Sequence, residues 1–105
     1  MESANVDGLL ARLEGKREEM VALTQDLVRV PTVNPPGDAY GACAGLVGER
    51  LRRRGFDVLY VRGEGTPGDS ERHPRVNVVA RRESSRPGPC LHFNGHLDVV
   101  PAGQG

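Results

Sequence analysis

A proline-rich segment at residues 31–38 divides this chain and limits what can fold on either side of it, because proline fixes φ and offers no N–H. Before it, apolar side chains recur at three- and four-residue steps, the period of one helix face. We expect this helix to begin at Asn5 or Asp7, to lose about 1 kcal/mol at Gly15 relative to alanine, and to end at Pro31. Its apolar positions are Val6, Leu9, Leu10, Leu13, Met20, Leu23 or Thr24, Leu27 and Val28.

A second helix is predicted from about Ala39 to Arg54, with Gly55 at the position of a C-terminal cap. Its last turn is rich in arginine, and positive side chains are favourable at the negative, C-terminal end of the helix dipole. A phosphate- or nucleic-acid-binding patch is the alternative, but zero net charge and 4% aromatic residues favour a solvated face. The apolar stripe of this helix is Cys43, Leu46, Val47 and Leu51.

Three short runs rich in β-branched and aromatic residues follow, at residues 56–61, 76–80 and 90–94, and each is typical of a strand. Glycine and proline mark a loop from Arg62 to Pro74. The segment Arg81 to Pro89 is too short for a crossover helix, so the last two strands should be antiparallel. The predicted fold class is α/β, with two helices and three strands of a mixed sheet.

Composition excludes several classes of protein. The 105 residues suit one domain, and 14 basic residues cancel 14 acidic ones, so no net charge attracts nucleic acid or a membrane. We find no signal-peptide pattern and no apolar run of about 18 residues, so a cytoplasmic location is expected. Cys43 and Cys90 fit no metal-binding spacing and are expected to be reduced, partly buried thiols.

A glycine-rich match at residues 63–68 satisfies the GxGxxG pattern of dinucleotide-binding loops. That pattern binds pyrophosphate only where the loop opens a helix. Here Pro67 interrupts it, Asp69 and Glu71 would repel phosphate, and another strand follows. We therefore expect a flexible hairpin loop.

Three histidines are candidates for chemistry. His73, in a loop before a proline, is expected to be solvated. His92 lies in the third predicted strand, about 13 Å from His96 if the strand continues, so the two cannot share one metal as a helical HExxH pair does. A histidine on a sheet face is the favoured interpretation of His92.

His96 has different surroundings, because Gly95 allows a sharp turn before it and Asp98 follows two residues later. The Asp98 carboxylate can accept the second N–H of the imidazole, which sets the tautomer and leaves the other nitrogen free as a metal ligand. From the residues alone, an ordinary hydrogen-bonded loop pair remains the alternative.

The whole heptad Gly95-His96-Leu97-Asp98-Val99-Val100-Pro101 closely resembles the first metal-site motif of the zinc-dependent aminoacylase family. That family includes acetylornithine deacetylase, succinyl-diaminopimelate desuccinylase and a glutamate-releasing carboxypeptidase. Residues 27–37 resemble the family's first helix and proline turn, residues 46–58 its second helix and first strand, and residues 77–80 the strand before the motif. The resemblance covers most of the chain.

The resemblance implies a fold and a set of roles. Residues 1–105 would be the N-terminal part of a zinc-peptidase-like catalytic domain, truncated after the first ligand motif. His96 would be a metal ligand and Asp98 the active-site carboxylate that holds it. The family site contains two zinc ions, with cobalt as an alternative metal, and hydrolyses amide bonds. The remaining ligands and the general base would lie after Gly105.

Two functional hypotheses follow. In the first, the chain is part of a zinc-dependent amidohydrolase of N-acyl amino acids or small peptides, inactive by itself because one histidine cannot hold the metal tightly. A homodimer is expected of the full-length protein, with no nucleic-acid or membrane partner. In the second, the chain is a non-catalytic α/β remnant without tight metal binding, whose third strand is an exposed edge.

Overall fold

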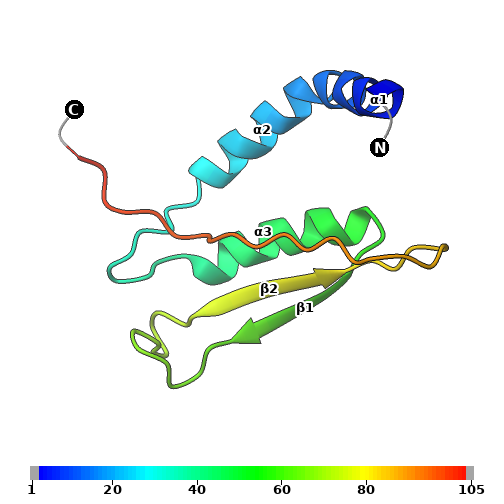
Figure 1. Cartoon of the computed structure of the whole chain (residues 1–105). Coiled ribbons are helices and arrows are strands. Elements are labelled where there is room, and N and C mark those ends of the chain that lie inside the picture. The colour runs from blue at the N-terminus through cyan, green and yellow to red at the C-terminus, as the bar shows by residue number, and fades with distance from the viewer. Residues whose placement is uncertain (1–2, 104–105) are drawn as a thin grey trace.

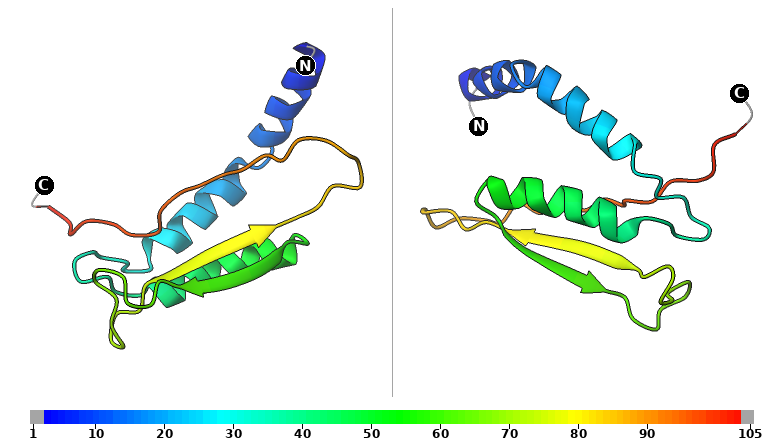
Figure 2. Two further views of the ribbon diagram at one scale, coloured as in Figure 1. Left: turned by 60° about the horizontal axis from the view of Figure 1, so that its bottom comes forward. Right: turned by 180° about the vertical axis from the view of Figure 1, so that it is seen from behind.

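The computed structural model describes residues 3–103 and shows helix α3 packed on one face of a two-stranded hairpin (Figure 1). The elements are α1 (Ser3–Glu14), α2 (Arg17–Val28), α3 (Tyr40–Arg53), β1 (Asp57–Arg62) and β2 (Val76–Arg81). Helices α1 and α2 form an arm on the opposite side of α3 from the hairpin (Figures 1 and 2). The α/β class is confirmed in these coarse terms.

The first helix is divided in two, which corrects the prediction of one continuous helix. A turn at Gly15 and Lys16 separates α1 from α2. At this point the amide of Lys16 donates to the carbonyl of Leu13 at 3.0 Å, a tighter bond than the α-helical step. Glycine has little helical preference and few tertiary contacts hold the arm, so the weak point becomes a break.

Helix α3 ends as the sequence predicts. Gly55 has a φ of +87°, and its amide donates to the carbonyl of Arg52 at 3.0 Å, while the amide of Phe56 donates to Leu51 at 3.1 Å. These two bonds form a Schellman motif, which closes the helix and turns the chain into β1.

The hairpin pairs β1 and β2 antiparallel, with Asp57 opposite Arg81 and Arg62 opposite Val76. Alternate residues of β2 are half-buried, so one face of this strand packs toward α3. The core itself is small. Among the residues whose side chains are described, the buried apolar ones are Cys43 and Ala44 on α3, at 2% and 0% exposure.

The third predicted strand is not present, which corrects both the three-strand count and the mixed sheet. Residues 90–94 are assigned to no strand, and among the described residues no backbone hydrogen bond joins them to β2. The segment runs back in the direction opposite to β2 but remains unpaired (Figures 1 and 2). Leu91 and Phe93 are 79% and 84% exposed. A strand pattern describes side chains, whereas a strand also needs a neighbour for its backbone groups.

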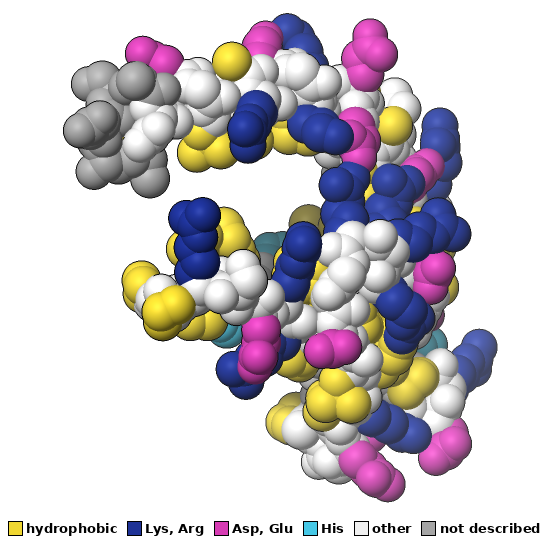
Figure 3. Space-filling view, turned by 90° about the vertical axis from the view of Figure 1, so that its right-hand side faces the viewer, with side chains coloured by type: hydrophobic (Ala, Val, Ile, Leu, Met, Phe, Trp, Pro, Cys, Tyr) yellow, Lys and Arg dark blue, Asp and Glu magenta, His cyan; other side chains and the backbone are white. Residues whose placement is uncertain are grey.

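Two ion pairs join the arm to the C-terminal end of α3. Arg50 donates to Asp26 at 2.5 Å, and Arg54 pairs with Glu19. Hydrophobic side chains on the side of the arm that faces the rest of the molecule stand across an open gap (Figure 3). Accordingly the apolar stripe of the arm is largely exposed, at Val6, Leu9, Leu10, Leu13 and Met20. Within residues 3–103, no helix has the length and apolar character to cross a membrane.

The loop between the strands is built around Asp69, whose side chain is 3% exposed. Arg62 donates to both of its oxygens at 3.2 Å, and the amides of Gly65 and Arg75 donate to it at 3.1 and 3.0 Å. These donors lower the pKa of Asp69 to about 2, with the Arg62 contact as the largest cause. The GxGxxG match is thus a hairpin loop that β2 follows, as predicted, although an ordered one.

Two glycines of α3 provide a matched test of the packing between helix and hairpin. A Cβ on Gly48 would meet the Tyr60 ring, whereas nothing lies within 4 Å of one on Gly45. Gly45→Ala should raise the free energy of unfolding by about 0.5–1 kcal/mol through helix propensity, and Gly48→Ala should lower it by about 1 kcal/mol through overpacking. Urea denaturation followed by circular dichroism measures both. Equal stabilisation by the two variants would contradict this packing.

Acid should release the loop through Asp69. Its folded pKa, about 2, lies below the ordinary 3.8, so its stabilising effect is complete above about pH 4 and is lost as the pH falls toward 2. Asp69→Asn should therefore lower the free energy of unfolding at pH 5, and the difference from the wild-type protein should shrink as the pH falls. Urea titrations of both proteins across this range give the difference, and a pH-independent difference would contradict the role of the carboxylate.

Candidate functional site

The segment around His96 is attached to the proline-rich residues 31–38, which form the connector between α2 and α3. Val33 and Val99 form an isolated parallel bridge, in which the amide of Val99 donates to the carbonyl of Thr32 and that of Asn34 donates to Val99, both at 2.9 Å. Thr32 is 2% exposed, and its hydroxyl donates to the carbonyl of Leu97 at 2.8 Å. We call these contacts the 32–34/97–99 bridge. It holds residues 65 positions apart in one place.

His96 and Asp98 interact directly on this attached segment. The imidazole Nδ1 of His96 lies 3.1 Å from Oδ1 of Asp98 and 3.0 Å from the backbone carbonyl oxygen of the same residue. Both partners are acceptors when the carboxylate is ionised, so Nδ1 carries the proton. The other nitrogen, Nε2, then has a free lone pair. The His96 side chain is 85% exposed, so this nitrogen can reach a ligand.

The second oxygen of Asp98 is held by the connector. Asn34 donates its side-chain amide to Oδ2 of Asp98 at 3.1 Å. This hydrogen bond is the largest cause that lowers the pKa of Asp98, and the charge of His96 acts in the same direction. Asp98 is therefore ionised at neutral pH and bridges Asn34 and His96.

Asn34 is in turn contacted by Arg75, which precedes β2. The Arg75 guanidinium donates to Oδ1 of Asn34 at 3.4 Å and stacks over the Tyr40 ring at 5.0 Å from its centroid. Burial, and after it the charge of Asp98, raise the pKa of Tyr40. Among the described residues no carboxylate lies within salt-bridge distance of Arg75. The half-buried positive charge of Arg75 is thus linked through Asn34 to the His96–Asp98 pair.

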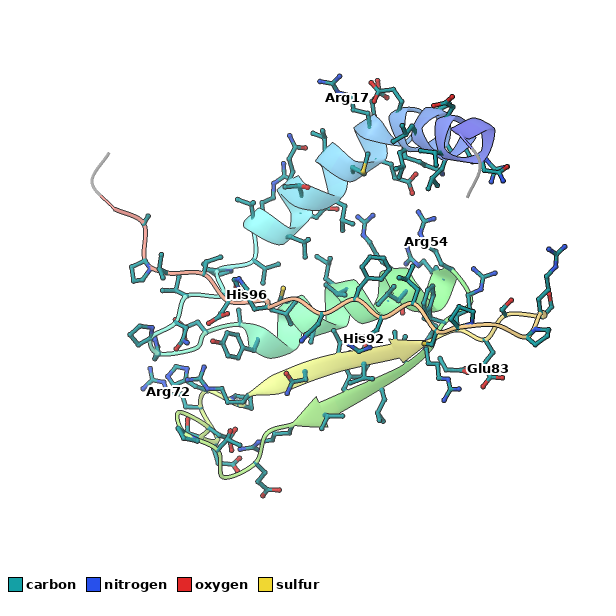
Figure 4. All side chains as sticks on the ribbon, in the orientation of Figure 1. Arg17, Arg54, Arg72, Glu83, His92 and His96 are labelled. Carbon is teal, nitrogen blue, oxygen red and sulfur yellow. The ribbon has the colours of Figure 1, made fainter. Side chains whose placement is uncertain are left out.

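These side chains line one groove with a volume of about 640 Å³. Its walls are residues 94–98 on one side and β2 on another, with Asn34, Tyr40 and Arg75 also contributing. Figure 4 shows His96 near the connector and His92 earlier in the same segment, farther from the connector. The groove presents an imidazole nitrogen, a carboxylate and a guanidinium to a ligand.

The described residues do not form a complete metal site. Among the described residues, no group of three or more histidine, cysteine, aspartate or glutamate side chains could hold a metal ion. His92 lies on the unpaired segment and is exposed, so its expected place on a sheet face is wrong. His96 fits the first ligand of a zinc site and Asp98 fits its hydrogen-bonded partner, but a stable site needs further ligands.

The structure also places His73, the two cysteines and the arginines at the end of α3. His73, expected to be solvated, is 23% exposed, and its Nδ1 lies 3.1 Å from Asp38. Cys43 is buried, which raises its pKa, while Cys90 is exposed, and both thiols are free. The arginines at the end of α3 pair with acidic side chains of α2 and α3, which agrees with the structural interpretation of that cluster.

Sequence reasoning did not identify Thr32, Asn34, Tyr40 or Arg75 as parts of the site. The first two lie in the proline-rich connector, for which the sequence predicts only a break between two helices. Arg75 and Asn34 are 41 positions apart, so no short-range spacing marks them as neighbours. Polar residues beside the prolines are the one local signal that was present.

Comparison with known proteins finds partial relatives with one shared name. The chain is 42% identical to a succinyl-diaminopimelate desuccinylase of Gluconacetobacter diazotrophicus over 86 residues, which are 81% of this chain and 20% of that protein. It is 34% identical over 87 residues to that of Psychrobacter arcticus, covering 83% of this chain and 20% of the relative. It is 39% identical over 83 residues to a succinyl-diaminopimelate desuccinylase of Cereibacter sphaeroides, covering 79% of this chain and 19% of the relative.

No family model and no solved structure matches the chain. The chain spans about a fifth of the length of the curated relatives that it matches. The similarity agrees with the resemblance carried by residues 95–101, because both point to the same kind of hydrolase.

Proposed function

We propose that this chain supplies the first ligand to the metal centre of a zinc-dependent hydrolase that cleaves amide bonds in N-acyl amino acids or small peptides. In this proposal residues 1–105 are the N-terminal part of the catalytic domain. His96 is the ligand and Asp98 the active-site carboxylate that holds it. The observation that carries the proposal is the Nδ1 contact of His96 with Asp98, which leaves Nε2 free on an exposed side chain that lines the groove.

The chain's own residues would prepare the ligand. The Asp98 carboxylate fixes the ring orientation, keeps the proton on Nδ1 and stabilises the positive charge that the imidazole acquires on binding a cation. The 32–34/97–99 bridge holds the backbone on both sides of Asp98. Zinc in such a centre supplies a Lewis acid and lowers the pKa of bound water. Two zinc ions, with cobalt as an alternative, are the expected metals.

The relatives' name makes an N-succinylated amino acid the first substrate to test. A deacetylase or peptidase activity also fits the proposed class, because the acyl group would be selected by residues that are not in this sequence. A cytoplasmic location and a homodimer of the longer protein are parts of the same proposal.

A zinc titration of the tag-free, ¹⁵N-labelled chain tests the assignment of His96. We expect weak binding that perturbs the His96 ring nitrogens selectively, because one histidine supplies one of the three or four ligands of a zinc site. Asp98→Ala should weaken this response by about 10-fold or more, the usual effect of removing the partner of a metal-bound histidine. Nuclear magnetic resonance of the imidazole nitrogens measures both.

His92→Ala is the matched control, since His92 is exposed on the same segment and makes no hydrogen bond among the described residues. It should leave the zinc response of His96 unchanged. An equal response of the two histidines, or none, would sink the assignment. Tight stoichiometric binding that a chelator removes would contradict the need for further ligands.

The remaining ligands can be sought in the gene. The hydrolase proposal expects that the reading frame after the codon of Gly105 encodes an aspartate and then a Glu-Glu pair. If these residues are found, the protein that includes them should lose desuccinylase activity on His96→Ala substitution. Their absence would favour the non-catalytic α/β module instead.

A further inference from the structure

We propose that Asn34 and Arg75 are positioning residues, which together hold the Asp98 carboxylate in place and so set the tautomer of His96. The four side chains form one line of hydrogen bonds. Arg75 donates to Asn34 at 3.4 Å, Asn34 donates to Asp98 at 3.1 Å, and His96 contacts Asp98 at 3.1 Å. The inference deepens the proposed function and rests on it, because the tautomer matters for catalysis only if Nε2 of His96 binds the metal.

The orientation of the Asn34 amide is determined by its two partners. A guanidinium can only donate hydrogen bonds, and an ionised carboxylate can only accept them. The amide oxygen must therefore face Arg75 and the amide nitrogen must face Asp98. In the opposite orientation, both contacts would be repulsive. Arg75 thus makes Asn34 a donor toward Asp98.

The backbone of Asn34 is fixed as well. Its amide donates to the carbonyl of Val99 at 2.9 Å, within the 32–34/97–99 bridge. The connector and the His96 segment therefore meet through both backbone and side chain at the same residue. A small displacement of the Asn34 side chain would leave the bridge in place, which allows the two contributions to be separated by experiment.

Arg75 is held by the loops on either side of it. Its guanidinium occupies the space that a Cβ on Gly37 or on Gly68 would take, and both glycines have positive φ values, +101° and +85°. The Tyr40 ring covers it from a third direction. Its backbone amide is fixed by Asp69 at 3.0 Å. This confinement explains how a flexible side chain can orient Asn34.

The Asp98 carboxylate is the point where this arrangement acts on His96. With Oδ2 held by Asn34, Oδ1 remains directed at Nδ1 of the imidazole. The Nδ1–H tautomer then dominates, and Nε2 stays free as a ligand. If Asn34 no longer donates, Asp98 can rotate away, and its backbone carbonyl oxygen, 3.0 Å from Nδ1, alone favours the Nδ1–H tautomer, so the share of the Nε2–H tautomer rises.

The ¹⁵N resonances of the His96 ring measure this tautomer directly in the metal-free chain, at a pH where the imidazole is neutral. We expect Asn34→Ala, Asn34→Asp and Arg75→Met to lower the ratio of the Nδ1–H to the Nε2–H tautomer by about two- to tenfold, as for the loss of one hydrogen bond of ordinary strength. Asn5→Ala is the matched control and should leave the ratio unchanged, because Asn5 lies on α1 and does not line the groove.

A glycine pair tests the confinement of Arg75. Gly68→Ala should lower the tautomer ratio by a similar factor, since its Cβ would displace the guanidinium. Gly65→Ala imposes a similar backbone cost at a φ of +73° but has nothing within 4 Å of its Cβ. It should therefore preserve the ratio, and equal effects of the two substitutions would refute the confinement of Arg75.

Hydrogen exchange at the amides of Asn34 and Val99 shows in each variant whether the 32–34/97–99 bridge remains. If Asn34→Ala opens the bridge, the Arg75→Met result decides, because in the described part of the chain no hydrogen bond joins Arg75 to the bridge backbone. An unchanged ratio in Arg75→Met overturns the role of Arg75, and an unchanged ratio in all Asn34 and Arg75 variants overturns the whole inference. These measurements need no metal, so a failed zinc titration would reject the proposed function without affecting them.

Discussion

The bridge between Val33 and Val99 is the contact on which the arrangement of the candidate site depends. Two backbone hydrogen bonds and the Thr32 hydroxyl attach the His96 segment to the connector. The preceding residues 90–94 are exposed and unpaired, so nothing else in that part of the chain places His96. Because Thr32 is buried, loss of its bond to Leu97 would leave polar groups without partners. The site therefore depends on a few polar contacts rather than on a large core.

Charged and polar side chains carry much of the organisation elsewhere too. Asp69 collects four donors and shapes the loop from which Arg75 extends. Arg50 and Arg54 connect the arm to α3 through Asp26 and Glu19. Exposed pairs of this kind each contribute little stability. The apolar stripe of the arm is exposed, so apolar packing contributes little to the position of the arm.

Local patterns predicted the elements better than their pairing. Helix α3, its glycine cap and the two strands of the hairpin follow from periodicity and turn residues within short windows. Gly15 is recognisable in the sequence as a weak point, but whether it breaks the helix depends on tertiary contacts, of which the arm has few. Residues 90–94 have the composition of a strand, and their backbone has no neighbour. Pairing is a property of two segments, which one segment cannot reveal.

For the candidate site, the sequence by itself determined the His96–Asp98 pair, because two residues so close along the chain can meet whatever the fold. It also carries the resemblance of residues 95–101 to the aminoacylase family, and the partial relatives named desuccinylases agree with that family in coarse terms. Only the tertiary structure decided that Asn34, Tyr40 and Arg75 lie behind this pair. These residues come from the connector, the start of α3 and the position before β2, and only folding brings segments so far apart in the chain into contact.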